Sequence, residues 1–344
     1  MKVKKYGFAV LFAIVLFVFT GYLLADTFLI SRVYTVVEQA QTPVGQEESE
    51  TVEFVLSQPT AQPTTQPEAT EQAETTAQPD VTEQTEAAAQ PTAEALTIAP
   101  VSDETSYSDG NIAIALSTFR IADTTVYVAD VQLSSADYLK TAFAQSAYGR
   151  NVTEKTSSIA SSVDAILAIN GDYYGAQRSG YVIRNGVLYR SSSSGSEDLV
   201  IYADGSFGIV SENDVTAEAL LASGAWNVLS FGPALVADGT VAVGVNDEVG
   251  KAMASNPRTA IGMIDDLHYV FAVADGRTSA SEGLSLYELA TFLQELGVKT
   301  AYNLDGGGSS SMVFMGNLIN NPTTNGKRTS ERSVSDIVYI GYGA

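Results

Sequence analysis

Asparagine, aspartate and arginine side chains stand beside glycine at the ends of several apolar stretches of this chain. The longest example is Asn303-Leu304-Asp305-Gly306-Gly307-Gly308-Ser309-Ser310, in which a carboxylate opens onto three glycines and then hydroxyls. Consecutive glycines let the backbone pass close to a ligand, and a strand that ends in such a loop gives a polar surface a rigid mount. We therefore expect residues 305–311, the glycine-rich loop, to form part of a site.

Three further groups of polar residues stand where an expected strand ends or, for the second group, begins. They are Asn170-Gly171-Asp172, Asn256-Pro257-Arg258-Thr259, and Asp275-Gly276-Arg277 with Glu282 shortly after. Arginine binds phosphate oxygens through planar donors, loop amides can form an anion-binding nest, and carboxylates supply acid, base or nucleophile chemistry. If these strand ends converge, the site suits a substrate that carries both a phosphate and a sugar.

The composition excludes several other chemistries. The 344 residues include no Cys and one His, which removes thiol nucleophiles, disulfides and thiolate metal sites. His268 lies in a strand-like alternation, which favours an ordinary strand position over Ser-His-Asp hydrolysis or a His-rich zinc site. The glycine-rich loop lacks the Lys of a nucleotide-binding P-loop. The net charge of −22 argues against nucleic acid as a partner.

Turn signals predict a series of β-hairpins and few helices. The expected hairpin turns are Asn185-Gly186, Asp204-Gly205, Asp238-Gly239, Asp265-Asp266 and Met315–Asn317. The clearest helix begins at Ser285, whose spacing to Glu288 is that of a capping box, and stops at Gly297. A second helix is predicted over residues 136–145 and a shorter one over 157–163. The pattern indicates an α+β fold with a largely antiparallel mixed sheet, several hairpins and a few packed helices.

The N-terminal third of the chain has a different character. Lys2, Lys4 and Lys5 precede an apolar run over residues 6–24, which predicts a transmembrane helix with its basic end in the cytoplasm. A cleavable signal peptide is the alternative, with a weak site at Leu24-Ala25-Asp26. Residues 33–105 are rich in Gln, Pro, Thr, Glu and Ala and predict a disordered linker.

Three segments are therefore expected: a membrane anchor over residues 1–32, the linker over 33–105, and a globular domain over 106–344. In this arrangement the membrane is a partner through the N-terminal helix. The protein would be a single-pass protein of the cell membrane whose C-terminal domain is extracellular.

Six motifs in this order resemble the phosphodiester glycosidase family, over about residues 110–342. They are Asn170–Tyr174, Phe231–Val236, Asn256–Gly262, Asp275–Arg277, Gly283–Ala290 and Asn303–Ser310. The resemblance implies a hydrolase that cleaves the glycosidic bond of a sugar-1-phosphodiester. Together with the expected anchor, it leads us to expect an extracellular hydrolase that acts on a cell-surface or exopolysaccharide substrate. It also implies that these motifs surround the active site.

On this reading Asp305 is one catalytic carboxylate, and either Asp172 or Glu282 is the other. Arg258 and Arg277 are expected to hold the phosphate, and Asn170 and Asn303 to bind sugar hydroxyls. The remaining expected substrate contacts are Gly171, Asp275, Gly306, Gly307, Gly308, Ser309 and Ser310.

Two alternatives remain open. A non-catalytic module that binds wall glycopolymers would contain the same groups. A metal-dependent phosphodiesterase that cleaves the P–O bond would use Asp172, Asp275 and Asp305 to hold a hard cation. The sequence requires no cofactor, although these carboxylates admit a divalent cation such as calcium, and it assigns no metal ligand.

Overall fold

The computed structural model describes residues 7–34, 101–102, 104–249 and 255–343. Most of the predicted linker, residues 35–100, lies outside these ranges, so its disorder stays a prediction. The N-terminal helix α1 covers Gly7–Phe28. Within the described ranges, no helix has both the length and the apolar character needed to span a membrane. The structure therefore does not support the predicted transmembrane anchor or the membrane partner.

The largest sheet of the globular part has nine strands in the order β15-β14-β18-β16-β17-β5-β4-β3-β2, and neighbouring strands are antiparallel. Its strands are β2 Val101–Ser102, β3 Ser106–Ser108, β4 Ile112–Ile121, β5 Thr124–Leu133, β14 Ala234–Ala237, β15 Thr240–Val241, β16 Arg258–Asp265, β17 His268–Ala274 and β18 Thr300–Leu304.

Two further sheets have five antiparallel strands each. In the sheet with the order β10-β9-β13-β11-β12, the strands are β9 Val182–Arg184, β10 Val187–Arg190, β11 Glu197–Tyr202, β12 Phe207–Ser211 and β13 Ala225–Leu229. In the sheet with the order β20-β19-β8-β21-β6, they are β6 Leu139–Phe143, β8 Leu167–Asn170, β19 Met312–Phe314, β20 Asn317–Leu318 and β21 Asp336–Ile340. A short pair joins β1 Arg32–Val33 to β7 Gly149–Arg150. These sheets confirm the predicted antiparallel α+β class and all five hairpins.

Few helices accompany the sheets. They are α2 Thr156–Ser162, α3 Ala217–Ala222 and α4 Leu286–Glu295, with short 3₁₀ turns η2 Ala136–Tyr138, η3 Ala144–Ser146, η4 Tyr174–Ala176 and η5 Gly307–Ser309. Helix α4 has the predicted capping box at Ser285 and Glu288. Helix α2 confirms the short helix expected over 157–163.

The helix predicted over residues 136–145 is wrong. This segment forms η2 and then strand β6, which pairs along its whole length with β21, from Leu139 opposite Ile340 to Phe143 opposite Asp336. Cross-strand hydrogen bonds and the burial of Leu139 outweigh the helical propensity of the segment. Partners almost 200 residues away therefore decide its structure.

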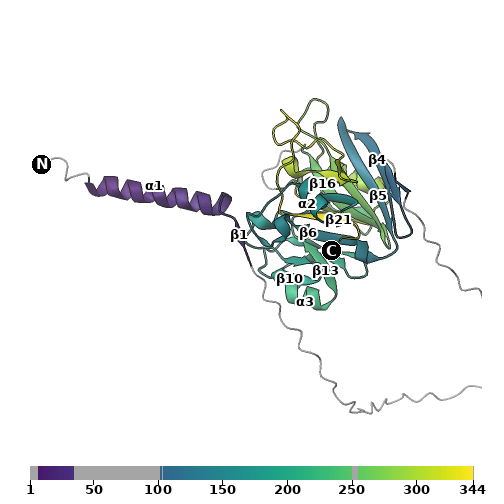
Figure 1. Ribbon diagram of the computed structural model, residues 1–344, viewed down its shortest axis with the longest axis horizontal. Helices are drawn as coiled ribbons and strands as arrows, with labels where there is room; N and C mark the ends of the chain where they lie inside the picture. Colours follow the sequence, from purple (N-terminus) through teal and green to yellow (C-terminus); the bar gives the residue numbers. More distant parts are fainter. Residues whose placement is uncertain (1–6, 35–100, 103, 250–254, 344) are drawn as a thin grey trace, which may run out of the picture. The chain divides into compact units, whose positions relative to one another are not determined.

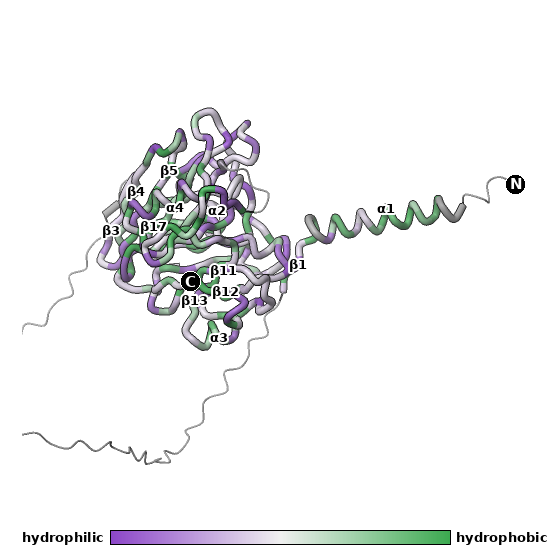
Figure 2. Tube along the Cα trace, turned by 180° about the vertical axis from the view of Figure 1, so that it is seen from behind, coloured by the Kyte–Doolittle hydropathy of each residue, from purple (hydrophilic) through white to green (hydrophobic). Residues whose placement is uncertain are grey.

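A shared hydrophobic core lies between the three sheets, and each sheet has a helix packed on its other face. Along β17, for example, Tyr269, Phe271 and Val273 enter the shared core, while Val270 and Ala272 join the cluster beneath α4. Helix α2 packs in the same manner on β8 and β21, and α3 on β10 and β13 (Figure 1). Figure 2 shows hydrophobic residues along the central strands and hydrophilic ones in the peripheral loops.

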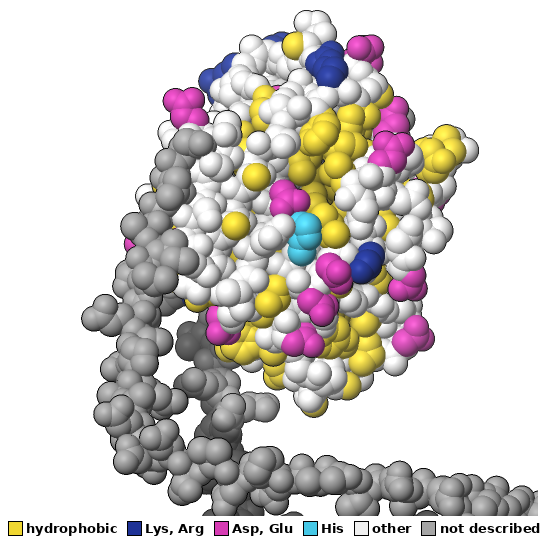
Figure 3. Space-filling model, turned by 90° about the vertical axis from the view of Figure 1, so that its right-hand side faces the viewer, with side chains coloured by type: hydrophobic (Ala, Val, Ile, Leu, Met, Phe, Trp, Pro, Cys, Tyr) yellow, Lys and Arg dark blue, Asp and Glu magenta, His cyan; other side chains and the backbone are white. Residues whose placement is uncertain are grey.

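His268 occupies the ordinary strand position that the sequence predicts. It opens β17, and its Nε2 lies 3.0 Å from Oδ2 of Asp130. Figure 3 shows this histidine in cyan on a face where acidic side chains prevail over basic ones.

Candidate active site

The register of the nine-stranded sheet brings three of the predicted motifs to one end. Leu304 of β18 pairs with Thr259 of β16, and Arg258 pairs with Ala274 of β17. The residues that follow β18 and β17, Asp305 and Asp275, therefore emerge beside the start of β16. The expected convergence of these strand ends is present in the structure.

Polar residues also lie at one end of the sheet that contains β8. Asn170 at the end of β8 pairs with Ile337 at the start of β21, and Ile169 pairs with Met312 at the start of β19. The Asn170–Asp172 motif, the end of the glycine-rich loop and Asp336 are consequently neighbours.

The Asn170 side chain links the polar end of the nine-stranded sheet to that of the sheet that contains β8. Its Nδ2 donates to the carbonyl of Asp305 at 2.7 Å, and its Oδ1 accepts from Thr259 Oγ1 at 2.8 Å and from the Ser311 amide at 3.2 Å. The side chain is fully buried, and both ends of its amide are bonded within the protein. The structure thus places Asn170 as a link between the loops of the site.

Asp305 is a nearly buried carboxylate, 8% exposed, at the centre of this junction. Its Oδ2 accepts the Ser309 hydroxyl at 2.6 Å, and Arg332 Nη2 lies 3.2 and 3.0 Å from its two oxygens. Arg332 also donates from Nε to Ser309 Oγ at 2.8 Å. Burial raises the pKa of Asp305, and the Arg332 guanidinium opposes that shift. The carboxyl is therefore held in place by partners that favour its ionised form.

The glycine-rich loop folds tightly against its neighbours. The amides of Gly307, Ser309 and Ser310 donate to the carbonyls of Pro257, Gly306 and Gly307 respectively, at 2.8–3.3 Å. At Gly308 a Cβ atom would lie 2.3 Å from Thr324 Oγ1, so this position has no room for a side chain. Ser309 and Ser310 are fully buried. Five of the seven loop amides, including those of Asp305 and Ser311, are thus bonded within the protein and do not form an open anion nest.

Three guanidiniums gather around this loop. Arg277 donates from Nη2 to Asn256 Oδ1 at 3.0 Å and from Nη1 to the Thr324 carbonyl at 2.7 Å. Burial and the nearby charges of Arg332 and Arg258 lower the pKa of Arg277. Mutual repulsion of this kind is tolerated where an anion binds between the arginines. We call Arg258, Arg277 and Arg332 the arginine group.

Arg258 and Arg332 each pair with an acid of the same protein, but Arg258 is the more buried of the two. Its Nη2 pairs with Glu248 Oε2 at 2.5 Å and its Nε donates to the Leu284 carbonyl at 2.9 Å. Its side chain is only 3% exposed, whereas that of Arg332 is 40% exposed. Arg332 is consequently far more accessible to a ligand than Arg258.

Two predicted acidic residues have other surroundings. Asp275 accepts the Asn320 side-chain amide at 3.1 Å and the Asn321 backbone amide at 2.9 Å, so it holds the segment after β20. Glu282 is exposed, and its backbone carbonyl accepts from the Arg277 amide at 3.0 Å. Its carboxylate is thus on the surface, unlike every other predicted acid of the site.

A buried ion cluster lies beneath the site. Arg184 Nη2 is 2.8 Å from Oδ2 of both Asp172 and Asp336, and Asp172 also accepts the amides of Tyr174 and Ser230 at 2.9 Å. Burial works against the charge on Arg184, but the two carboxylates raise its pKa. Burial and the Asp172 charge raise the pKa of Asp336 to about 7. Asp172 is therefore occupied by a structural partner.

Gly171 connects this buried ion cluster to Asp305. Its amide donates to the Asp336 carbonyl at 2.9 Å, and its own carbonyl accepts from the Asp305 amide at 3.3 Å. A Cβ atom on Gly171 would lie 2.3 Å from Asp336 Oδ1. Only glycine permits this approach between the ion cluster and the carboxylate above it.

A model of the phosphodiester glycosidase family matches residues 164–341, which include every motif described above. The chain belongs to the phosphodiester glycosidase family. The match covers most of the globular domain and confirms the resemblance in the sequence motifs.

Individual relatives match parts of this chain. The SPbeta prophage-derived uncharacterized protein YomE of Bacillus subtilis is 30% identical over 201 residues, which are 57% of this chain and 31% of that protein. Human N-acetylglucosamine-1-phosphodiester alpha-N-acetylglucosaminidase is 44% identical over 66 residues, 19% of this chain and 13% of the human protein. The chain thus spans a third or less of these curated relatives.

Solved structures show the same fold. The catalytic domain of zebrafish N-acetylglucosamine-1-phosphodiester alpha-N-acetylglucosaminidase, in a form auto-inhibited by its pro-peptide, matches with a TM-score of 0.54 and 23% identity, over 67% of this chain and 83% of that one. A hypothetical protein from Synechocystis matches with a TM-score of 0.53 and 14% identity, over 67% and 62% of the two chains.

Three residues of the candidate site had no role assigned from the sequence: Arg184, Asp336 and Arg332. Asp336 had a signal, because it opens an otherwise apolar and fully buried strand. Arg332 belongs to the polar segment that follows the glycine-rich loop. Arg184 adjoins the Asn185-Gly186 turn, where a charged side chain is usually exposed, so its burial had no local signal.

The three carboxylates that were expected to hold a cation each have other partners in the structure. Asp172 pairs with Arg184, Asp275 binds Asn320 and Asn321, and Asp305 pairs with Arg332. Across the residues with described placement, no group of three or more acidic or histidine side chains is arranged to hold a metal ion.

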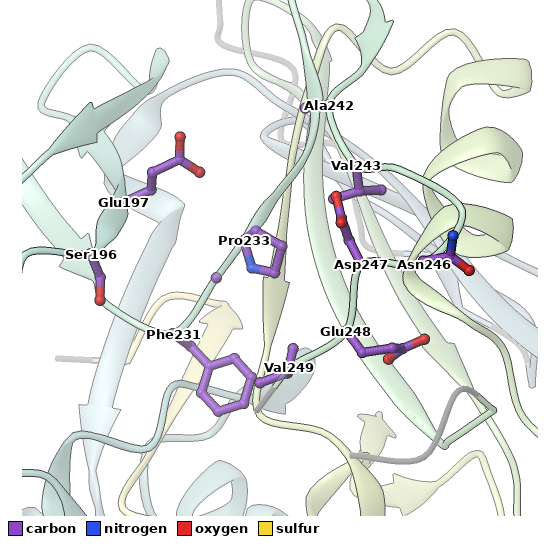
Figure 4. A pocket seen from close by; sticks show the side chains of 11 residues that line it. Ser196, Glu197, Phe231, Pro233, Ala242, Val243, Asn246, Asp247, Glu248 and Val249 are labelled. Carbon is purple, nitrogen blue, oxygen red and sulfur yellow. The ribbon is translucent and has the colours of Figure 1, made fainter. Parts of the chain in front are cut away.

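A pocket of about 690 Å³ adjoins the site (Figure 4). Three of its lining residues contact predicted site residues. The carbonyls of Gly232 and Pro233 accept from Asn303 Nδ2 at 2.8 Å and from the Asn303 amide at 3.1 Å, and Glu248 pairs with Arg258. Asn303 itself is buried, 1% exposed. The pocket and the arginine group are therefore parts of one continuous region.

Proposed function

We propose that the protein hydrolyses a sugar-1-phosphodiester and releases the sugar. The observation that carries this proposal is the nearly buried Asp305 carboxyl, which pairs at the end of β18 with Arg332, a member of the arginine group. A phosphate diester needs cationic partners, and cleavage beside it needs a group that can transfer a proton. Family membership and the names of the human and zebrafish relatives support N-acetylglucosamine as the sugar.

The arginines supply the binding of the phosphate. Arg332 is partly exposed and Arg277 lies next to it, so their planar donors can reach non-bridging phosphate oxygens. Neutralising the phosphate charge makes the phosphomonoester a better leaving group. Arg258 contributes less because Glu248 already occupies it.

Asp305 is proposed as the carboxyl that acts on the bond between the sugar and the bridging oxygen. Burial raises its pKa in spite of the opposing Arg332 charge, which suits a general acid that protonates this oxygen. The bond between the anomeric carbon and the oxygen then breaks through an oxocarbenium-like state. Water adds to the carbon and gives its proton to the Asp305 carboxylate, which restores the acid. Asp172 and Asp336 are proposed to act indirectly, since both are nearly inaccessible and share Arg184.

The test uses the full chain and a sugar-1-phosphodiester in ¹⁸O-labelled water. Label on the anomeric carbon of the released sugar supports glycosidic cleavage. Label on the phosphate would identify a phosphodiesterase that cleaves the P–O bond, and saturable binding with no turnover would identify a glycopolymer-binding module. Asp305→Asn should abolish sugar release, whereas the exposed Asp266→Asn should not. Equal rates in the two variants would refute the role of Asp305.

We further propose that the domain works outside the cytoplasm. Lys2, Lys4 and Lys5 before an apolar stretch are typical of an export signal, and an extracellular setting fits a polysaccharide-linked substrate. Protease added to intact cells should degrade the domain. Protection of the domain until the cells are lysed would contradict this location.

A further inference from the structure

The pocket beside the arginine group has a chemical character opposite to that group. We propose that it binds the sugar part of the substrate and selects uncharged or amine-bearing sugars over acidic ones. This inference rests on the proposed function, because it assigns the sugar end of the sugar-phosphate substrate. It adds a specificity that neither the family nor its named members convey.

The first argument is position. The pocket wall at Gly232 is bonded to Asn303, and Asp305 follows Asn303 by two residues, roughly 7 Å along an extended chain. The wall at Glu248 is bonded to Arg258 of the arginine group. A small substrate can therefore place one end in the pocket and its phosphate at the arginines.

The second argument is the mixture of surfaces in the pocket. Phe231, Pro233, Val243 and Val249 form apolar walls, and Asn246 supplies an amide (Figure 4). Apolar walls with a few polar groups are typical of small-molecule sites, and the volume of about 690 Å³ lies within their usual range. A sugar ring matches this mixture, since its C–H faces pack on apolar side chains while its hydroxyls bond to polar ones.

Asn303 provides an independent observation. Its Nδ2 holds the Gly232 carbonyl at the pocket wall, and its Oδ1 is buried without a hydrogen-bond partner among the described residues. Buried polar atoms of this kind are uncommon because an unpaired acceptor costs free energy. Asn303 does not itself line the pocket, so its contribution is to fix the position of the Gly232 wall.

The third argument is charge. Glu197, Asp247 and Glu248 line the pocket, and none of its described lining residues is basic. Glu248 is neutralised by Arg258, whereas Glu197 and Asp247 are exposed acids without a basic partner in the lining. A uronic acid or a second phosphate in the pocket would be repelled, and an ammonium group would be attracted.

The experiment measures binding to the full chain by ligand-observed NMR, so that it does not depend on turnover. The probes are the methyl α-glycosides of N-acetylglucosamine, glucosamine and glucuronic acid, each with and without saturating inorganic phosphate. We expect the neutral and amine-bearing glycosides to bind in the presence of phosphate and the glucuronide not to bind. Glucuronide binding as tight as that of the neutral glycoside, or displacement of all three by phosphate, would overturn the inference.

Glu197→Gln tests the charge argument, with Glu218→Gln of α3 as the exposed control. The first variant should weaken glucosaminide binding by about two- to fivefold, the range for exposed charge pairs, while phosphate binding stays unchanged. Identical binding by the two variants would contradict the role of Glu197. If the glycosides bind as expected but no diester is hydrolysed, the pocket inference stands and the proposed hydrolase function fails.

Discussion

Gly171→Ala should destabilise the protein strongly although it adds a single methyl group. The new Cβ would lie 2.3 Å from Asp336 Oδ1, 2.7 Å from its Cγ and 3.1 Å from its Oδ2. Ordinary contacts between such atoms begin near 3.5 Å, so the carboxylate must retreat by about 1 Å. The backbone at Gly171 cannot move away, because its amide and carbonyl are bonded to Asp336 and Asp305.

The size of the destabilisation follows from the contacts that Asp336 loses when its carboxylate is displaced. Overpacking of a rigid interior costs about 1–3 kcal/mol. Asp336 also contacts Arg184 at 2.8 and 2.9 Å, and a buried ion pair that loses one partner costs about 3–5 kcal/mol. Arg184 retains Asp172, so the second cost applies only in part. We expect the free energy of unfolding to fall by about 3 kcal/mol, a large share of the usual 5–15 kcal/mol.

The assay is urea denaturation followed by far-UV circular dichroism and by the fluorescence of Trp226, the single tryptophan. Gly341→Ala is the matched control, because it is a buried glycine just after β21 whose Cβ would meet its nearest atom at 3.4 Å. The control should change stability by less than about 1 kcal/mol. If Gly171→Ala were as stable as this control, the placement of Asp336 against Gly171 would be wrong.

Two further predictions concern charged groups. Arg332→Lys should lower kcat/KM for the diester by about 10²–10³, the usual loss when a charge-stabilising donor is removed, whereas the exposed Arg328→Lys should not; equal losses would refute the assignment. Asp198 is buried beside Glu212, and burial raises its pKa to about 9. The unfolded chain releases this proton near pH 4 and the folded protein does not, so Asp198 opposes folding increasingly as pH rises from about 4 to 9. Asp198→Asn should therefore gain stability over the wild type between pH 5 and pH 8 in denaturation curves, and a constant difference would contradict the shift.

The local parts of the fold were predictable because local chemistry determines them. Asn185-Gly186 and Asp204-Gly205 adopt turns that few other dipeptides tolerate, and Ser285 with Glu288 satisfies the first amides of α4 within one turn. Strand β6 was not predictable in this manner. Its conformation depends on pairing with β21, and nothing in residues 136–145 indicates that partner.

The candidate site likewise has one part that local sequence predicts and one part that depends on distant partners. The strand ends that carry Asp275 and Asp305 were recognisable because glycine beside a charged residue at the end of an apolar run is a local pattern. The pairing of Arg184 with Asp336 joins residues 152 positions apart, and neither residue shows it in its own surroundings. The sequence shows that both residues carry charges, but only the fold shows that they form an ion pair.

The buried contacts also change what the shared motif means. Asn170 and Gly171 stand in the most recognisable motif of the chain, yet both are buried and bonded to the loops around Asp305. Arg332, whose side chain is 40% exposed, belongs to a segment that the motifs do not include. The motif is therefore better explained as the support of the site than as its contact surface. If so, substitutions at Asn170 should reduce stability and activity together, whereas substitutions at Arg332 should reduce activity more than stability.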